Sequence, residues 1–178
     1  KVLDQKQIQS LGMGGVLSVN RGSVNPPTFN ILSYLPNKNN QKPIILVGKG
    51  VVYDTGGLSL KPTPNSMDCM KSDMGGAAAV IGAIYAISKM KLNVNVIGLI
   101  PAVENRPGGN AYVPGDVVTM MDGSSVEVLN TDAEGRMILA DALHYAKGFD
   151  PKLVLDVATL TGSAARAVGK YGIVAMGN

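Results

Sequence analysis

Short runs of apolar residues recur along this chain and predict buried strands. Residues 43–47, 94–101 and 153–158 are dominated by Ile, Leu and Val. Runs of this length with little alternation are typical of strands that are covered on both faces. Residues 29–35 instead alternate between apolar and polar positions and lie between proline-containing turns, so we predict a further strand there.

Two longer segments, 77–90 and 133–147, carry apolar residues at helical spacing, and Gly148 is placed to end the second one. Shorter elements complete the prediction: a helix at 4–11, strands at 16–19 and 173–176, and a hairpin that joins 117–121 to 126–129. Strands that alternate with helices in this way are typical of an α/β fold. We therefore expect a three-layer sandwich with a largely parallel central sheet flanked by helices.

Composition supports a packed domain and limits the classes of partner. Of the 178 residues, 46% are hydrophobic and 16% are charged, as in a well-buried globular domain. The net charge is +3 without a dense Lys/Arg block, so binding to nucleic acid is not indicated. The most apolar run, 75–87, is too short to span a bilayer, and we expect no association with a membrane.

The single cysteine and the single histidine exclude several kinds of chemistry. Cys69 has no cysteine partner, which excludes a disulfide within the chain and a zinc-finger site. We interpret Cys69 as a small buried hydrophobic residue in a protein from a reducing compartment. His144 falls inside the predicted helix 133–147, where we expect it to serve packing rather than catalysis.

Charged residues concentrate in the segment 130–136, whose sequence is Asn-Thr-Asp-Ala-Glu-Gly-Arg. This segment joins a predicted strand to a predicted helix, a junction where α/β sheets place ligands. Asp132 and Glu134 would point the same way if the chain is extended there. The alternative is structural, because Thr131 and Glu134 also match the capping box that begins many helices.

A second group of charges follows the apolar run 43–47. It comprises Lys49, Asp54, Lys61 and Asp73, again at predicted strand ends or before a helix. Four carboxylates that converge in one fold repel one another unless cations lie between them. Two metal ions that share carboxylate ligands resolve this repulsion, and such pairs activate water for hydrolysis. Oxygen ligands suit Mn, Mg or Zn, so the residues alone do not name the metal.

Three motifs carry a resemblance to a known family. Residues 130–136 resemble the signature of the leucyl (cytosol) aminopeptidase family of metallopeptidases. Residues 49–61 and the segment Met-Lys-Ser-Asp-Met-Gly-Gly at 70–76 are similar to the other two metal-binding segments of that family, in the same order. The segment Ala-Thr-Leu-Thr-Gly at 158–162 also matches, and the resemblance covers nearly the whole chain.

The resemblance implies a role for each matching residue. The five metal ligands would be Lys49, Asp54, Asp73, Asp132 and Glu134. The two catalytic residues would be Lys61, which polarises the scissile carbonyl, and Arg136, which holds a bicarbonate ion that acts as general base. The residues that contact the substrate would be Met70, Asn130, Thr159 and Gly162.

The resemblance also implies an activity and its setting. It points to an aminopeptidase that removes N-terminal residues from peptides, with Leu and similar apolar residues preferred. Two divalent ions would be bound, Zn or Mn, with Mg and Co as further candidates. The family assembles as a hexamer, so we expect a homo-oligomer, and we expect a cytoplasmic location. Residues 1–178 match the central part of the catalytic domain, so an N-terminal domain and the C-terminal part of the catalytic domain are expected to be absent from this chain.

Two alternatives remain at this point. The triplet Asp54-Thr55-Gly56 is also found in aspartic proteases, where two copies would pair their aspartates in a homodimer. The chain could instead bind metal without catalysing a reaction, because small misplacements of a substrate pocket cost about a hundredfold in rate. A chelator distinguishes a metallopeptidase from an aspartic protease.

Overall fold

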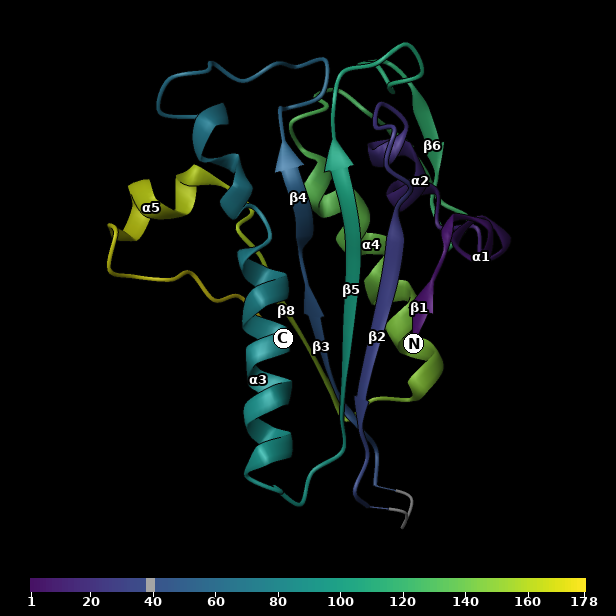
Figure 1. Cartoon of the computed structure of the whole chain (residues 1–178), viewed down its shortest axis with the longest axis vertical. Coiled ribbons are helices and arrows are strands. Elements are labelled where there is room, and N and C mark those ends of the chain that lie inside the picture. Colours follow the sequence, from purple (N-terminus) through teal and green to yellow (C-terminus); the bar gives the residue numbers. More distant parts are fainter. Residues whose placement is uncertain (38–40) are drawn as a thin grey trace.

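A six-stranded mixed sheet forms the centre of the fold in a computed structural model that describes residues 1–37 and 41–178 (Figure 1). The strand order is β1-β2-β5-β3-β8, and β4 pairs with β5 beyond the end of β3. The strands are β1 (Val2–Leu3), β2 (Thr28–Tyr34), β3 (Ile44–Gly48), β4 (Gly50–Asp54), β5 (Val96–Asn105) and β8 (Leu153–Val157).

The centre of the sheet is parallel, as predicted. β5 runs parallel to β3 and β4, and β3 runs parallel to β8. β1 and β2 add an antiparallel edge on the other side of β5. The carboxyl ends of β3, β4, β5 and β8 therefore point to the same end of the sheet, where ligands bind in folds of this kind.

Helices cover both faces of the sheet, which confirms the three-layer α/β sandwich (Figure 1). α3 (Gly75–Lys89) packs on one face through a buried cluster that includes Val80 and Ile84. α2 (Gly14–Asn20) and α4 (Glu134–Ala146) pack on the other face within the larger apolar cluster. The remaining elements are α1 (Gln5–Ser10), η1 (Met67–Ser72), η2 (Lys147–Phe149), α5 (Gly162–Val168) and the hairpin strands β6 (Val117–Thr119) and β7 (Ser125–Glu127).

Two glycines let the start of α3 lie against the sheet backbone. A Cβ atom at Gly76 would lie 2.0 Å from the carbonyl oxygen of Val157, and one at Gly48 would lie 2.7 Å from Cα of Ala77. Larger residues at these two positions would push α3 away from β3 and β8. The close approach brings Asp73, two residues before α3, to the carboxyl end of β3.

Lys49 interrupts what would otherwise be one long strand. β3 ends at Gly48 and β4 begins at Gly50. The backbone N–H of Lys49 still donates to Val157, and its carbonyl oxygen accepts from Ala77, so the break is fixed on both sides. No strand was predicted at residues 50–54, where the structure has β4.

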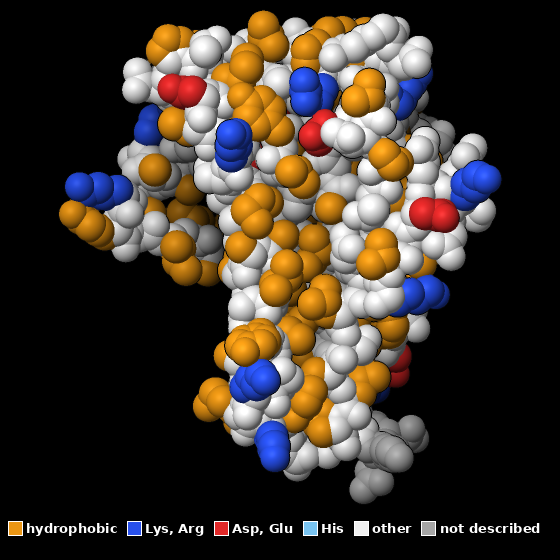
Figure 2. Space-filling view, in the orientation of Figure 1, with side chains coloured by type: hydrophobic (Ala, Val, Ile, Leu, Met, Phe, Trp, Pro, Cys, Tyr) orange, Lys and Arg blue, Asp and Glu red, His pale blue; other side chains and the backbone are white. Residues whose placement is uncertain are grey.

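Apolar surface remains uncovered in this chain. Hydrophobic side chains gather on the face shown in Figure 2. On α3, Ile81 and Tyr85 are 46% and 64% exposed. No residue of α5 is buried, and Tyr171 and Ile173 beyond it are almost fully exposed. Among the described residues, we find no helix with the length and apolar character needed to cross a membrane.

Two of the predicted strands are wrong. Residues 16–19 lie in α2, because the helix is buried against α4 and its first turn is held by a carboxylate of α4. Residues 173–176 form no strand: Ile173 and Met176 are more than nine-tenths exposed, and none of the described strands pairs with them. The predicted hairpin is confirmed as β6 and β7.

The single cysteine and the single histidine lie in different environments. Cys69 is exposed on η1, so its interpretation as a buried residue is wrong. The short helix η1 contains no buried residue, because it lies in the surface loop between β4 and α3. His144 lies half-buried inside α4, as expected for a packing residue.

Asp141 joins α4 to two other parts of the fold. Its Oδ2 accepts a hydrogen bond of 3.0 Å from the backbone N–H of Val16, and its Oδ1 accepts one of 2.9 Å from that of Met121. The side chain is buried. Both carboxylate oxygens are therefore used, one to begin α2 and one to hold the approach to the hairpin.

We predict that Asp141→Asn lowers the free energy of unfolding by about 1–3 kcal/mol, because an amide offers one acceptor and leaves a buried N–H without one. Urea denaturation measures this loss. The exposed Asp156 of β8 provides the control, and Asp156→Asn should change stability by less than about 0.5 kcal/mol. Equal effects of the two substitutions would contradict the prediction.

Candidate metal centre

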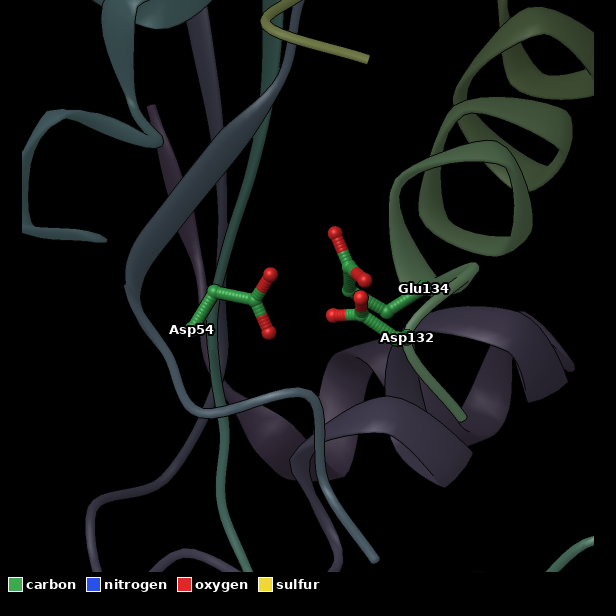
Figure 3. Close-up of side chains that lie close together, drawn as sticks. All are labelled: Asp54, Asp132 and Glu134. Atoms are coloured by element: carbon green, nitrogen blue, oxygen red, sulfur yellow. The ribbon is translucent and has the colours of Figure 1, made fainter. Parts of the chain in front are cut away.

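Charged side chains converge at the carboxyl end of the parallel strands. Asp54 is the last residue of β4, and Asp73 lies two residues before α3, at the end of η1. Asp132 and Glu134 come from the start of α4. In Figure 3 the carboxylates of Asp54, Asp132 and Glu134 point toward one another. One oxygen of each lies within 4.8 Å of the others, close enough to share a metal ion.

Lys49 lies between two of the carboxylates. Its Nζ is 2.8 Å from Asp73 Oδ1 and 2.8 Å from Glu134 Oε1. It also donates a hydrogen bond of 2.9 Å to the carbonyl oxygen of Thr159, which follows β8. A Cβ at Gly135 would lie 2.8 Å from Cε of Lys49, so glycine is needed there for the lysine to reach Glu134.

Lys61 joins the other two carboxylates. Its Nζ is 3.1 Å from Asp54 Oδ2 and 2.6 Å from Asp132 Oδ1. The side chain of Lys61 is 14% exposed and that of Asp132 is 32% exposed, whereas Asp54 is buried. Lys61 and Asp132 therefore form the side of the cluster that solvent and substrates can reach.

Burial shifts the ionisation of the inner residues. Burial raises the pKa of Glu134 to about 7, an effect that the positive charge of Lys49 opposes and the negative charge of Asp54 reinforces. Burial also raises the pKa of Asp73, against the hydrogen bonds from Lys49 and Thr159. For Lys49, burial lowers the pKa, but Glu134 and Asp73 together outweigh it and the pKa lies above its ordinary value.

The donor set fits divalent metal ions. Four carboxylates and two lysine ammonium groups leave an excess of negative charge in a site that is mostly buried. Asp73 Oδ2 and Glu134 Oε2 are buried and have no hydrogen-bond partner among the described residues. A buried carboxylate oxygen without a partner is costly, and a bound cation removes that cost. For Lys49 to be a ligand it must lose its proton, which a nearby divalent charge favours.

The capping-box interpretation of this segment is wrong. α4 begins after Ala133, whose position carries no side-chain cap. The hydroxyl of Thr131 donates to the carbonyl oxygen of Gly56, and Glu134 points to Lys49 instead of to the helix backbone. Residues 131–132 form a turn rather than extended chain. The turn and the start of α4, not an extended backbone, therefore bring the carboxylates of Asp132 and Glu134 together.

Arg136 lies apart from the carboxylates. It is exposed and lines a pocket with Met120, Asp122 and Val126, between α4 and the hairpin. Arg136 forms no ion pair with a carboxylate in the part of the chain that the structure describes. Its role in holding bicarbonate stays a prediction.

The expected substrate-binding residues lie at different distances from the cluster. Thr159 is part of it, since its hydroxyl donates a hydrogen bond of 2.7 Å to Asp73 Oδ1. Asn130 is exposed, and its Oδ1 accepts from the backbone N–H of Asp132. Met70 is half-buried on η1, and Gly162 begins α5. Their contacts with a substrate stay predictions.

Comparison with known proteins agrees with this geometry. A family model described as the catalytic domain of the cytosol aminopeptidase family matches residues 1–178. The chain belongs to the cytosol aminopeptidase family. This confirms the resemblance seen in the sequence motifs.

Curated relatives are similar over nearly the whole chain. A "probable cytosol aminopeptidase" of Nitrosomonas europaea is 54% identical over 177 residues, which cover 99% of this chain and 35% of the relative. One of Chlorobaculum tepidum is 58% identical over 169 residues, which cover 94% of this chain and 33% of the relative. One of Nitrosospira multiformis is 56% identical over 168 residues, with coverage of 94% and 32%. The chain thus spans about a third of the length of these relatives.

Three buried polar residues lie beside the cluster of this cytosol aminopeptidase family member; the sequence pointed to neither Asn105 nor Tyr112, and it suggested only a helix-capping role for Thr131. Asn105, Tyr112 and Thr131 are each at most 1% exposed and form hydrogen bonds with one another or with Asp54. An asparagine at the carboxyl end of a buried strand was the available signal. Asn105 was overlooked because the predicted strand 94–101 ended before it, whereas β5 extends to Asn105.

We predict that the metal-stripped chain loses stability as the pH rises, partly through Glu134. Its pKa is raised from 4.5 to about 7, so the folded state favours the protonated form. This stabilisation is complete below the unfolded pKa and is lost as the pH rises through the folded pKa. Between about pH 5 and pH 8, in excess chelator, we expect this group to remove on the order of 2 kcal/mol.

Urea denaturation across that pH range measures the effect. Glu134→Gln cannot titrate, so the stability of this variant should fall less steeply with pH than that of the wild type. If both proteins show the same dependence on pH, Glu134 is not the group responsible.

Proposed function

We propose that this protein is an aminopeptidase with a dinuclear metal site that removes N-terminal residues from peptides, with Leu and similar apolar residues preferred. One observation carries the proposal: four carboxylates from three separate segments converge at the carboxyl end of a parallel sheet, and two lysines lie between them. The names of the relatives, which are cytosol aminopeptidases, point to the same class of reaction and to a cytoplasmic location.

The proposed ligands are Lys49, Asp54, Asp73, Asp132 and Glu134. Bound divalent ions, with Zn and Mn as the leading candidates and Mg and Co as others, would supply an activated water and a Lewis acid for the peptide carbonyl. The unpartnered oxygens of Asp73 and Glu134 support this assignment.

Lys61 has the access that a catalytic ammonium group needs. It lies at the solvent-facing side of the cluster, and its backbone N–H donates to the carbonyl oxygen of Thr55, the residue after Asp54. We propose that its ammonium group binds the oxygen of the scissile carbonyl and stabilises the negative charge that develops there. Arg136 is proposed to hold a bicarbonate ion that receives the proton of the attacking water, which requires its side chain to turn toward the cluster.

The substrate would lie over the exposed side of the cluster. Met70, Thr159 and Gly162 are proposed to line the pocket for the N-terminal side chain, and Asn130 to contact the peptide beyond it. The half-buried position of Met70 on η1 and the contact of Thr159 with Asp73 support this arrangement. Assembly into a hexamer is proposed from the family resemblance alone.

The geometry gives no support to the aspartic protease alternative. That mechanism needs the Asp54 carboxyl to meet the same group of a second copy and to share a proton with it. Asp54 is only 2% exposed, and its carboxylate already contacts Lys61, Asn105 and the backbone of Gly56. A second copy therefore has no access to this carboxylate.

We predict hydrolysis of a Leu-anilide substrate in the presence of Mn or Zn, and loss of this activity in excess chelator. Asp132→Ala should lower the rate by about a hundredfold or more, because a ligand on the substrate side is removed. Glu127→Ala, a change at an exposed acid of β7, should leave the rate unchanged.

Metal content, measured on the same samples, separates the outcomes. Two ions per chain without hydrolysis would mean that this chain binds metal but is catalytically silent. Hydrolysis that survives chelation, or a chain that binds no metal, would contradict the proposed function.

A further inference from the structure

Three buried polar residues lie at two of the three segments that carry the proposed carboxylate ligands. We call Asn105, Tyr112 and Thr131 the brace. All three are at most 1% exposed, and none belongs to the proposed set of ligands. Asn105 and Thr131 form hydrogen bonds that join the segment 54–61, which begins at the end of β4, to the segment 131–134, which leads into α4, and Tyr112 donates to the carbonyl oxygen of Thr131.

Asn105 is the centre of the brace. Its Nδ2 donates one hydrogen bond of 2.8 Å to Asp54 Oδ1 and another of 3.0 Å to the carbonyl oxygen of Thr131. Both hydrogens of a planar amide are thus used, one on each ligand-bearing segment. The rigid amide sets the distance between the carboxylate of Asp54 and the backbone that leads to Asp132.

The same contacts orient the carboxylate of Asp54. Its Oδ1 accepts from Asn105 and also from the backbone N–H of Gly56, at 2.9 Å. With Oδ1 held by two donors, Oδ2 is the oxygen that faces Lys61. Rotation of the carboxylate would break two hydrogen bonds to a charged group, so the brace selects one orientation.

Thr131 fastens the two segments a second time. Its hydroxyl donates to the carbonyl oxygen of Gly56 at 2.7 Å and accepts from the backbone N–H of Ser59 at 2.8 Å. Its own N–H donates to Ser59 Oγ at 3.1 Å. The carbonyl oxygen of Thr131 also accepts from Tyr112 at 2.9 Å. The backbone before Asp132 is thereby held on both sides.

Close packing leaves the brace no room to shift. A Cβ atom at Gly57 would lie 2.8 Å from Asn105 Oδ1 and 2.9 Å from Thr131 Oγ1. Gly57 also has a φ of +64°, which side chains rarely adopt, so glycine suits the position for two reasons.

We propose that the brace is a set of positioning residues that fixes the separation of the two ligand-bearing segments and thereby sets the affinity of the site for metal. The inference rests on the proposed function in taking Asp54, Asp132 and Glu134 as ligands. Without the brace, metal binding must order both segments, and this cost appears as weaker binding. Residues that orient metal ligands in this way are typically worth about 10–100-fold in affinity.

The test is Asn105→Leu, which keeps the approximate size of the side chain, adds no charge and removes both donors. Competition with a chromophoric chelator measures the affinity for Zn or Mn. We expect binding to weaken about 10–100-fold. Excess metal should restore much of the hydrolysis rate, since the ligands themselves are intact, whereas a merely misfolded site would not be rescued.

The matched control is Asn95→Leu at the opposite end of β5. Asn95 is also buried, and its Nδ2 also donates to two carbonyl oxygens, those of Asn37 and Gln41. This substitution should cost comparable stability and leave metal affinity within about twofold of the wild type. A similar loss of affinity in both variants, or wild-type affinity in folded Asn105→Leu, would overturn the proposal.

Two further measurements keep the proposal testable. If Asn105→Leu does not fold, Thr131→Val removes only the hydroxyl bonds to Gly56 and Ser59. It should weaken metal binding about fivefold or more, and wild-type affinity in this variant would overturn the proposal.

If the wild type binds no metal, the proposed function fails, and hydrogen exchange then tests the brace alone. The backbone N–H groups of residues 131–133 should exchange about tenfold faster in whichever of Asn105→Leu and Thr131→Val folds, because the segment is no longer held. Unchanged exchange would overturn the proposal, whatever the wild type binds.

Discussion

The structure depends on holding four carboxylates together in a mostly buried place. Such charges repel one another, and the cost of removing them from water adds to the repulsion. Lys49 and Lys61 offset part of it, each by lying between two of the acids. What remains is an excess of negative charge and two carboxylate oxygens without partners, on Asp73 and Glu134. Divalent cations would supply the missing positive charge. The same excess of negative charge therefore makes the site costly without metal and suits it to hold the ions of the proposed reaction.

The rest of the fold brings these side chains together by close backbone packing. The break at Lys49 between β3 and β4 places the lysine at the end of the sheet, and Gly76 lets α3 approach so closely that Asp73 reaches it. On the other face, Asp141 of α4 accepts a hydrogen bond from the first turn of α2 and so joins the two helices, and Glu134 is the first residue of α4. The buried hydrogen bonds of Asn105 then connect the two sides. The packing of the backbone therefore determines where the proposed ligands lie.

Local pattern predicted the elements whose burial is set by their own sequence. The parallel strands β3, β5 and β8 were predicted from their continuous apolar runs, and the helices α3 and α4 from apolar residues at helical spacing, whereas the short parallel strand β4 was not predicted. Prediction failed where a distant contact decides. Residues 16–19 look like a strand, but Asp141, 125 residues from Val16 along the chain, holds the first turn of α2. Residues 173–176 are apolar enough for a strand, yet no strand in the part of the chain that the structure describes pairs with them.

The sequence by itself determined which side chains are available to bind metal. These are the acids and lysines, in the order of three motifs, because a single histidine and a single cysteine offer few nitrogen or sulfur ligands. It also determined the α/β class, because hydrophobic period is a local property. Only the tertiary structure decided how the charged groups pair. It also decided that the hydroxyl of Thr131 bonds to the carbonyl oxygen of Gly56 instead of capping a helix, and that Asn105 lies between the two ligand-bearing segments. The physical reason is that hydrogen bonds of buried polar groups join residues far apart in the chain, and no local pattern records which partner each group finds.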